Sequence, residues 1–346
     1  MSRQLPHTLA IFQKRIDGDD ALLELARLRF KDAGLGPEFY AGSVEELSWL
    51  LNFRPWPEAP ATVHLARDID LFSPSGRSQV LDFAGRFGSR IFGFVVHDQA
   101  EIPAQREAYL AALGEINREL LAMPDRPLLF IEYAVGLEPD FFCGLMESVR
   151  DLAQVSACLD VGHLGIRQIR ADYRTRDPDR DVCAWRLDDP ELPPRMADIA
   201  ASVATALPVV LKTIKQLGRL GKPLHLHLHD GHPLSTFSPF GVADHLGFEQ
   251  EIPIPFSYQG QTSLATMFGP QGLAAIVNAS LVAVPPQLLS LSLEIHPTGE
   301  RDPLAEWRTR LFPHWTDTTN AELQNNWLSI LERNHELVRD FLGRFS

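Results

Sequence analysis

The chain has little cysteine and no excess of basic charge, and each shortage excludes a class of protein. Its 346 residues include three cysteines, and these lack paired spacing, which argues against a disulfide framework and against a closed structural zinc site. Asp and Glu number 45 against 32 Lys and Arg, so the formal net charge is −13. That balance does not attract nucleic-acid phosphates or an anionic membrane. We expect neither as a partner.

The sequence also lacks an apolar run of membrane-spanning length, a Gly-x-Gly-x-x-Gly turn and an internal repeat. Without such a run we expect no membrane span, and the few scattered cysteines then favour a cytoplasmic protein. Without the glycine turn, the main sign of a doubly wound dinucleotide-binding sheet is missing. The remaining composition, 45% hydrophobic and 22% charged, is typical of a folded globular chain.

Strand-like apolar runs alternate with segments of helical period along almost the whole chain. The runs predict strands at 7–12, 37–41, 61–66, 90–97, 127–133, 155–161, 223–229 and 289–295. Helices are predicted at 19–31, 43–52, 78–87, 104–122, 138–150, 196–220 with a break at Pro208, 270–280 and 321–341. A strand and a helix repeated eight times predict an α/β fold, the (β/α)8 TIM barrel, with a doubly wound open sheet as the alternative. We expect one barrel domain over residues 1–346, with a helical C-terminal segment at 303–346.

Two connections, 167–195 and 230–269, are longer than usual and follow the carboxyl ends of predicted strands. Barrel enzymes build their active sites at that end. The first connection is rich in arginine, and one interpretation makes it a lid whose Arg170 or Arg174 binds an anionic substrate. The alternative is a solvated excursion held by its own ion pairs.

Residues 224–233 read Leu-His-Leu-His-Leu-His-Asp-Gly-His-Pro. Side chains alternate between the faces of a strand, so His225, His227 and His229 share one face and the leucines share the other. A row of imidazoles indicates a polar cavity, and metal binding is one explanation. Interior histidines that are satisfied by hydrogen bonds are the other.

Six consecutive predicted strands end in a potential metal ligand. These residues are His64, His97, Glu132, Asp160 with His163, His227 with Asp230, and Glu294. Because parallel strands of a barrel end at one rim, we expect these side chains to meet there. Imidazoles mixed with carboxylates suit a divalent ion such as Mn, Zn, Mg or Fe.

This order of residues resembles the xylose isomerase-like barrel superfamily, over roughly residues 60 to 296. The superfamily includes sugar isomerases and epimerases of the tagatose-epimerase type, dehydroshikimate dehydratases and the DNA-repair enzyme endonuclease IV. The resemblance rests on one Glu, an Asp-x-x-His, a His followed shortly by Asp, and a last Glu, which here are Glu132, Asp160 with His163, His227 with Asp230, and Glu294.

The resemblance implies a set of roles. The ligands of one divalent metal would be Glu132, Asp160, His227 and Glu294. In the isomerase and epimerase branch, Glu132 and Glu294 would also shuttle protons across the substrate, which fits the chemistry of a metal-stabilised enediolate. His163 would contact substrate or a second ion. We further expect His229 and Asp230 to contact substrate.

The sequence departs from the epimerase pattern in two ways. The arginine that epimerases carry shortly after the strand-seven histidine is missing, since residues 231–233 are Gly-His-Pro. In addition, His64 and His97 match histidines that endonuclease IV uses for an additional zinc. A further zinc of that enzyme uses an Asp-x-His, for which this chain offers Asp230 with His232, or the displaced pair Asp244 and His245. The site is therefore predicted to hold one ion, with two or three as the alternative.

From these observations we predict a metal-dependent isomerase or epimerase of a sugar, sugar phosphate or related polyhydroxy compound, placed in carbohydrate metabolism. The alternatives are a multi-zinc phosphoester hydrolase and a multi-iron oxidative enzyme on the same barrel. The expected partner is a small polyhydroxylated molecule, neutral or anionic, and a homo-oligomer is left open.

Overall fold

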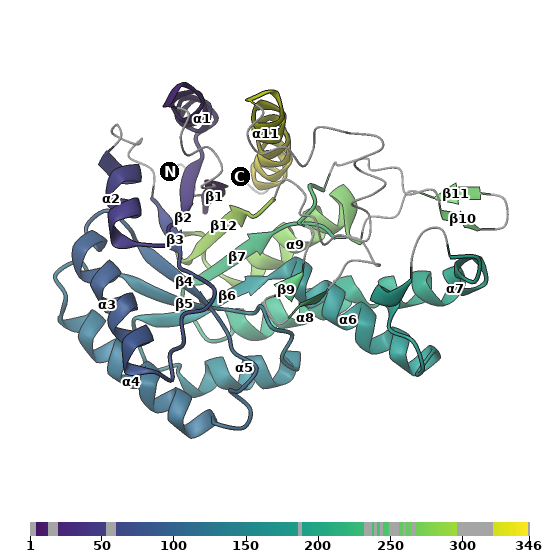
Figure 1. Cartoon of the computed structure of the whole chain (residues 1–346), viewed down its shortest axis with the longest axis horizontal. Coiled ribbons are helices and arrows are strands. Elements are labelled where there is room, and N and C mark those ends of the chain that lie inside the picture. Colours follow the sequence, from purple (N-terminus) through teal and green to yellow (C-terminus); the bar gives the residue numbers. More distant parts are fainter. Residues whose placement is uncertain are drawn as a thin grey trace.

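The computed structural model describes residues 5–12, 20–52, 60–185, 189–231, 237–238, 241–242, 245–248, 256–258, 261–263, 267–295 and 321–344. At its centre lies a closed barrel of parallel strands in the order β1-β12-β7-β6-β5-β4-β3-β2 (Figure 1). Helices follow the strands and cover the outside of the barrel. The predicted (β/α)8 barrel is confirmed, and the open sheet is wrong because β1 pairs with β12 and closes the ring.

The barrel strands occupy the eight predicted positions. Their bounds are β1 His7–Phe12, β2 Gly36–Tyr40, β3 Thr62–His64, β4 Gly93–His97, β5 Leu128–Glu132, β6 Val155–Asp160, β7 Leu224–Leu228 and β12 Leu289–Leu293. Both faces of these strands are buried, and β1, β4, β5 and β6 are mostly continuous runs of hydrophobic residues, whereas β2, β7 and β12 also contain polar residues. This continuity is what made them recognisable in the sequence.

The described helices agree with the predicted ones except for an additional helix, α6. Their bounds are α1 Asp20–Ala33, α2 Val44–Asn52, α3 Pro74–Phe87, α4 Arg106–Ala122, α5 Pro139–Ser148, α6 Val161–Arg176, α7 Leu192–Val203, α8 Ala206–Gly218, α9 Gly269–Ala283 and α11 Ala321–Gly343. Helix α2 begins with a capping pair, since Glu46 N donates to Ser43 Oγ at 3.1 Å.

Two layers of apolar side chains surround the sheet. The larger lies between strands and helices and includes Leu224, Leu226 and Leu228 of β7. A smaller cluster of Val95, Phe130 and Cys158 is separate from it and comes from β4, β5 and β6. The leucines of β7 thus face the helices, which leaves its histidines to face the inside of the barrel.

The two long connections contain more regular structure than the sequence predicted. Residues 167–176 belong to α6, and a short 3-10 helix at Val182–Ala184 and helix α7 follow. The expected loop at 167–195 is therefore mostly helical. In the second connection, β8 Phe237–Ser238 pairs with β9 Gly241–Val242, and β10 Phe256–Tyr258 pairs with β11 Gln261–Ser263, both antiparallel. Figure 1 shows α7 and the β10–β11 pair projecting beyond α6.

The stretch Leu192–Gly218 differs from the expectation of no membrane-length apolar run. By length and composition it could cross a membrane, with a mean hydropathy of 1.5. The structure divides it into α7 and α8, and α8 packs against α5, α6 and α9. The break falls at residues 204–205, and Pro208 lies in the first turn of α8, where a missing N–H costs no helical hydrogen bond.

Helix α11 packs against α1 and α9 and so completes the outer layer between the last strand and the first helix (Figure 1). Trp327 Nε1 donates to the carbonyl of Ile295 at 2.7 Å. His335, with 2% of its surface exposed, lies with Nε2 3.2 Å from Thr8 Oγ1 of β1. These contacts attach the C-terminal helix to β1 and to the residues after β12, the two strands whose pairing closes the barrel.

Replacement of His335 by glutamine should make stability less dependent on pH. Burial, and to a smaller extent the charge of Arg339, lower the pKa of His335 to about 4. An unfolded histidine has a pKa of about 6.5, so between about pH 6.5 and 4 the unfolded chain binds more protons and the free energy of unfolding falls with falling pH. Urea unfolding at pH 7 and at pH 5 should show a smaller loss for H335Q than for the native chain. Equal losses would contradict the assignment.

Candidate metal centre

The carboxyl ends of four strands bring together the four residues that the sequence proposed as ligands of one ion. One ligand atom from each of Glu132, Asp160, His227 and Glu294 lies within 4.8 Å of the others. All four side chains are buried, with at most 5% of the surface exposed. His227 Nδ1 lies 2.8 Å from Glu294 Oε2 and 3.5 Å from Glu132 Oε1. The predicted convergence is therefore present.

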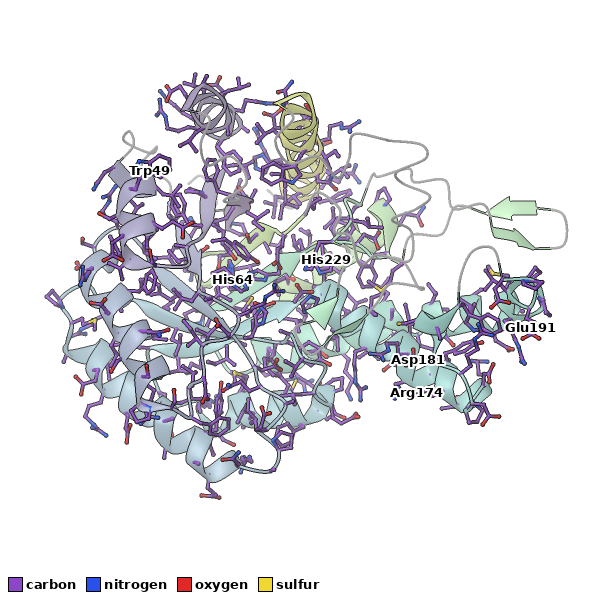
Figure 2. The ribbon with its side chains drawn as sticks, in the orientation of Figure 1. Trp49, His64, Arg174, Asp181, Glu191 and His229 are labelled. Carbon is purple, nitrogen blue, oxygen red and sulfur yellow. The ribbon has the colours of Figure 1, made fainter. Side chains whose placement is uncertain are left out.

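Four further groups of potential ligands adjoin this one among the described residues. Two of them share His227 with it, namely Cys158 with His225 and His227, and His64 with His227 and Glu294. The other two extend the centre through Glu132 and Asp160. The first contains His64, His97 and Glu132, and the second contains Asp160, His163, His229 and His245. Figure 2 shows the labelled His64 and His229 in the middle of the barrel. The groups are not independent, because Glu132 belongs to two of them and Asp160 also belongs to two.

Glu132 divides its two oxygens between separate groups. Oε2 lies 2.7 Å from His64 Nε2 and 3.5 Å from His97 Nε2, whereas Oε1 lies 3.5 Å from His227 Nδ1 and 4.0 Å from His163 Nδ1. Burial raises the pKa of Glu132, but His97, His227 and His64 together hold it well below its usual range. Burial also lowers the pKa of His97, to about 4. Glu132 is thus an anion and His97 a neutral imidazole at neutral pH.

Asp160 also uses its oxygens differently. Oδ1 accepts the backbone N–H of His163 at 2.7 Å and lies 2.9 Å from His229 Nε2. Oδ2 lies 3.8 Å from His163 Nε2 and 4.0 Å from His227 Nδ1. One oxygen is therefore held in place, and the other faces the imidazoles of the centre.

The donor set fits a divalent ion. Among the described residues, Glu132 Oε1 and Asp160 Oδ2 are buried without a hydrogen-bond donor. A buried carboxylate oxygen without a donor is costly unless a cation completes it. Carboxylates with imidazoles are ligands for Zn, Mn or Fe. These residues could hold a metal, whose identity the donor set leaves open.

Strand β2 contributes two site residues that sequence reasoning missed. Tyr40 OH donates to Glu294 Oε1, and its ring stacks on His64 with centroids 4.4 Å apart. Glu38 lies 2.8 Å from both His225 Nε2 and His227 Nε2. The available signal was a glutamate and a tyrosine at spacing two within an otherwise buried strand, which places both on one face.

Two residues expected to contact substrate have hydrogen-bond partners within the protein. His229 is fully buried, with Nε2 at Asp160 and Nδ1 2.8 Å from the carbonyl of Asp230. Burial lowers the pKa of His229, but Asp160 outweighs it and raises the value to about 9. Asp230 accepts the backbone N–H groups of Gly231, Phe268 and Gly269, and so holds the start of α9. In the part of the chain that the structure describes, each polar atom of these two side chains thus has a protein partner.

The proposed lid arginines are also engaged elsewhere. Arg170 Nη2 and Arg174 Nη2 each lie 2.8 Å from Asp181 Oδ2. Figure 2 shows Arg174 and Asp181 together, away from His64 and His229. These ion pairs are the ones that the alternative of a self-paired excursion expects, and the lid stays a proposal. Asp244 lies outside the described residues, whereas His245 Nε2 lies 3.3 Å from His163 Nε2.

The fold and this centre define an enzyme-like (β/α)8 barrel with His, Asp and Glu groups that could hold metal. No protein-family model and no curated protein sequence matches the chain.

Solved structures of another barrel protein do match. They include the carboxyl transferase domain from Rhizobium etli pyruvate carboxylase with pyruvate, with a TM-score of 0.40 and 12% identity over 97% of this chain and 48% of that one. The complete multifunctional pyruvate carboxylase of the same organism matches with a TM-score of 0.40 and 11% identity, over 98% of this chain and 28% of that one.

This chain spans about half the length of the first structure, which covers the carboxyl transferase domain. Likeness this distant carries no information on activity. The resemblance to the xylose isomerase-like superfamily stays a proposal.

Replacement of Gly162 by alanine should disturb the centre through His229. A Cβ at Gly162 would overlap the His229 ring, so the ring must move and Asp160 loses its partner. We expect a loss of about 1–3 kcal/mol in the free energy of unfolding, as for an overpacked core, and weaker zinc binding. Urea unfolding and chelator competition measure the two effects.

Gly114 of α4 is the matched control, because a Cβ there meets no atom within 4 Å. G114A should be neutral or stabilising by up to about 1 kcal/mol, since alanine favours the helix. If G162A behaves like G114A in both measurements, the role given to the His229 contact is wrong.

Proposed function

We propose that the chain is a metal-dependent hydrolase that holds more than one divalent ion and cleaves a phosphoester. The observation that carries this proposal is the division of the Glu132 oxygens between the His64–His97 side and the His227–His163 side. A carboxylate with one oxygen toward each of two imidazole groups is arranged to bridge two ions. Two-ion sites of this kind clamp the attacking and leaving oxygens of a phosphoryl displacement.

The charge of the centre links ion number to substrate charge. The central group has three carboxylates, Glu132, Asp160 and Glu294. One divalent ion would leave a net negative charge of one, which disfavours an anionic substrate. Two ions would leave one positive charge, and three would leave three, which attract a phosphoester. The number of ions bound therefore predicts the charge of the substrate.

The chain's own residues supply binding and orientation. Divalent ions here would supply Lewis acidity to the phosphoryl group and would lower the pKa of a water molecule. His64 and His97 would hold the ion on one side of Glu132, and Asp160, His227 and Glu294 the ion on the other. His163 and His245 are placed for a third.

An isomerase or epimerase is the second candidate. It is favoured because Glu132 and Glu294 belong to the same donor group, as proton transfer across a substrate held by one ion requires. Two contacts oppose it: Glu132 Oε2 is held by His64, and Glu294 Oε1 accepts from Tyr40. Such contacts suit fixed ligands better than carboxylates that exchange protons with a sugar.

The expectations from the sequence about domain organisation, substrate and location are proposed together with this function. We propose one barrel domain, a small anionic substrate rather than nucleic acid, and a cytoplasmic location. A homo-oligomer remains open, and an oxidative enzyme with several irons would use the same donors.

Metal content and turnover test the proposal together. Elemental analysis after reconstitution with Zn, Mn or Fe should give two or three equivalents per chain, and bis-aryl phosphate should be hydrolysed until a chelator is added. Paired replacement of His64 and His97 by asparagine should remove about one equivalent and lower kcat/KM by at least about a hundredfold, because one side of the clamp is lost. E147Q, at an exposed α5 carboxylate, should change neither.

Two other combinations of metal content and turnover would support a different function. One equivalent with turnover of ketoses would overturn the hydrolase in favour of the isomerase. Iron-specific occupancy with oxygen consumption and no phosphoester cleavage would overturn it in favour of an oxidative enzyme.

A further inference from the structure

A buried carboxylate of β2 lies beneath the metal centre. Glu38 has no exposed surface, nor have His225 and His227, which it contacts from across the barrel. Its Oε1 lies 2.8 Å from His227 Nε2, and its Oε2 lies 2.8 Å from His225 Nε2. Thr62 Oγ1 of β3 donates to Oε2 at 2.7 Å. Each oxygen of Glu38 therefore serves a different imidazole.

The two imidazoles differ in whether a ring nitrogen is left to bind a metal. His225 Nδ1 lies 2.7 Å from Ser290 Oγ, so both ring nitrogens of His225 have protein partners. His227 Nε2 lies next to Glu38. His227 Nδ1 faces the centre, where it lies 3.5 Å from Glu132 Oε1, 4.0 Å from Asp160 Oδ2 and 2.8 Å from Glu294 Oε2. His227 is the ring that connects Glu38 to the centre.

A neutral imidazole has one N–H and one lone pair, and the partner of one nitrogen decides which nitrogen binds a metal. Glu38 Oε1 lies 2.8 Å from His227 Nε2, which is hydrogen-bond distance, although the two groups are not aligned for the bond. When Nε2–H is donated to this carboxylate, the lone pair lies on Nδ1. We propose that Glu38 is a positioning residue that fixes the ring and tautomer of His227, so that Nδ1 is its ligand atom. A carboxylate behind a ligating histidine also increases the basicity of that ligand.

This inference rests on the metal centre of the proposed function but not on the reaction. It would hold for the hydrolase, the isomerase or the oxidative enzyme alike. Its test must therefore measure metal binding rather than turnover.

E38Q is the informative variant, because it keeps the size of the side chain and removes its charge. The amide can accept from one imidazole only, and its NH2 group would favour the His227 tautomer with a proton on Nδ1. Zinc affinity, measured by chelator competition, should fall about tenfold to hundredfold, as for other lost partners of metal-bound histidines. The visible absorption of the cobalt-loaded protein should change, because the ligand field changes with His227.

S290A is the matched control in the same network. It removes the partner of His225 Nδ1 and leaves both contacts of His227 in place. Its zinc affinity and cobalt spectrum should match those of the native chain. E38D, which keeps the charge on a shorter side chain, should bind zinc more tightly than E38Q.

The tautomer of His227 can also be observed directly in the native chain, without the Glu38 variants. In the zinc-loaded native chain with 15N-labelled histidine, the His227 signal, assigned by its loss in H227N, should show a protonated Nε2 and a metal-bound Nδ1. A metal-bound Nε2 would overturn the proposal, as would a folded E38Q with native affinity and spectrum. If zinc binds as expected but no phosphoester is cleaved, only the proposed function fails. If the native chain binds no divalent ion, both fail.

Discussion

Buried negative charge is the constraint on which the centre depends. Glu38, Glu132 and Asp160 are each fully buried, and an isolated carboxylate in such a place is too costly to remain ionised. Burial raises the pKa of Glu38, but His227 and His225 outweigh burial and keep it well below its usual range. The same balance governs Glu132. The histidines thus keep Glu38 and Glu132 charged, with or without a role as ligands.

The register of the barrel explains why these particular residues meet. His97 of β4 is paired with Glu132 of β5, and Asp160 of β6 is paired with His227 of β7. One step deeper along β7, His225 is paired with Ser290 of β12. Because inward-facing side chains repeat every second residue, the barrel interior is layered. The apolar cluster of β4, β5 and β6 adjoins the level of Glu38 and His225, since the Phe130 and His225 ring centroids are 5.2 Å apart, and the metal centre follows toward the carboxyl ends.

The sequence could predict the strands and the donor group but not the contacts inside it. Strands buried on both faces are long apolar runs, and a ligand at the end of each run is visible without coordinates. Glu38 was missed because it lies in the middle of its strand, Gly-Pro-Glu-Phe-Tyr, whereas ligands were expected at the strand ends. His229 was expected to contact substrate because alternation places a histidine on a face without showing whether its ring contacts a ligand or a carboxylate of the protein. That distinction depends on Asp160, whose distance in space no sequence spacing gives.

Helix α6 shows how one motif serves two purposes. Asp160 is the residue before the first turn of α6, and its Oδ1 accepts the N–H of His163. An Asp-x-x-His spacing is therefore also the spacing of a helix cap, in which the side chain accepts the N–H three residues later. The cap fixes the rotation of the carboxylate, so Oδ2 points to the imidazoles while Oδ1 satisfies the helix. It also sets the position of His163 one turn along. The metal-facing geometry of Asp160 and His163 thus follows from the start of a helix, which is why so short a motif can specify it.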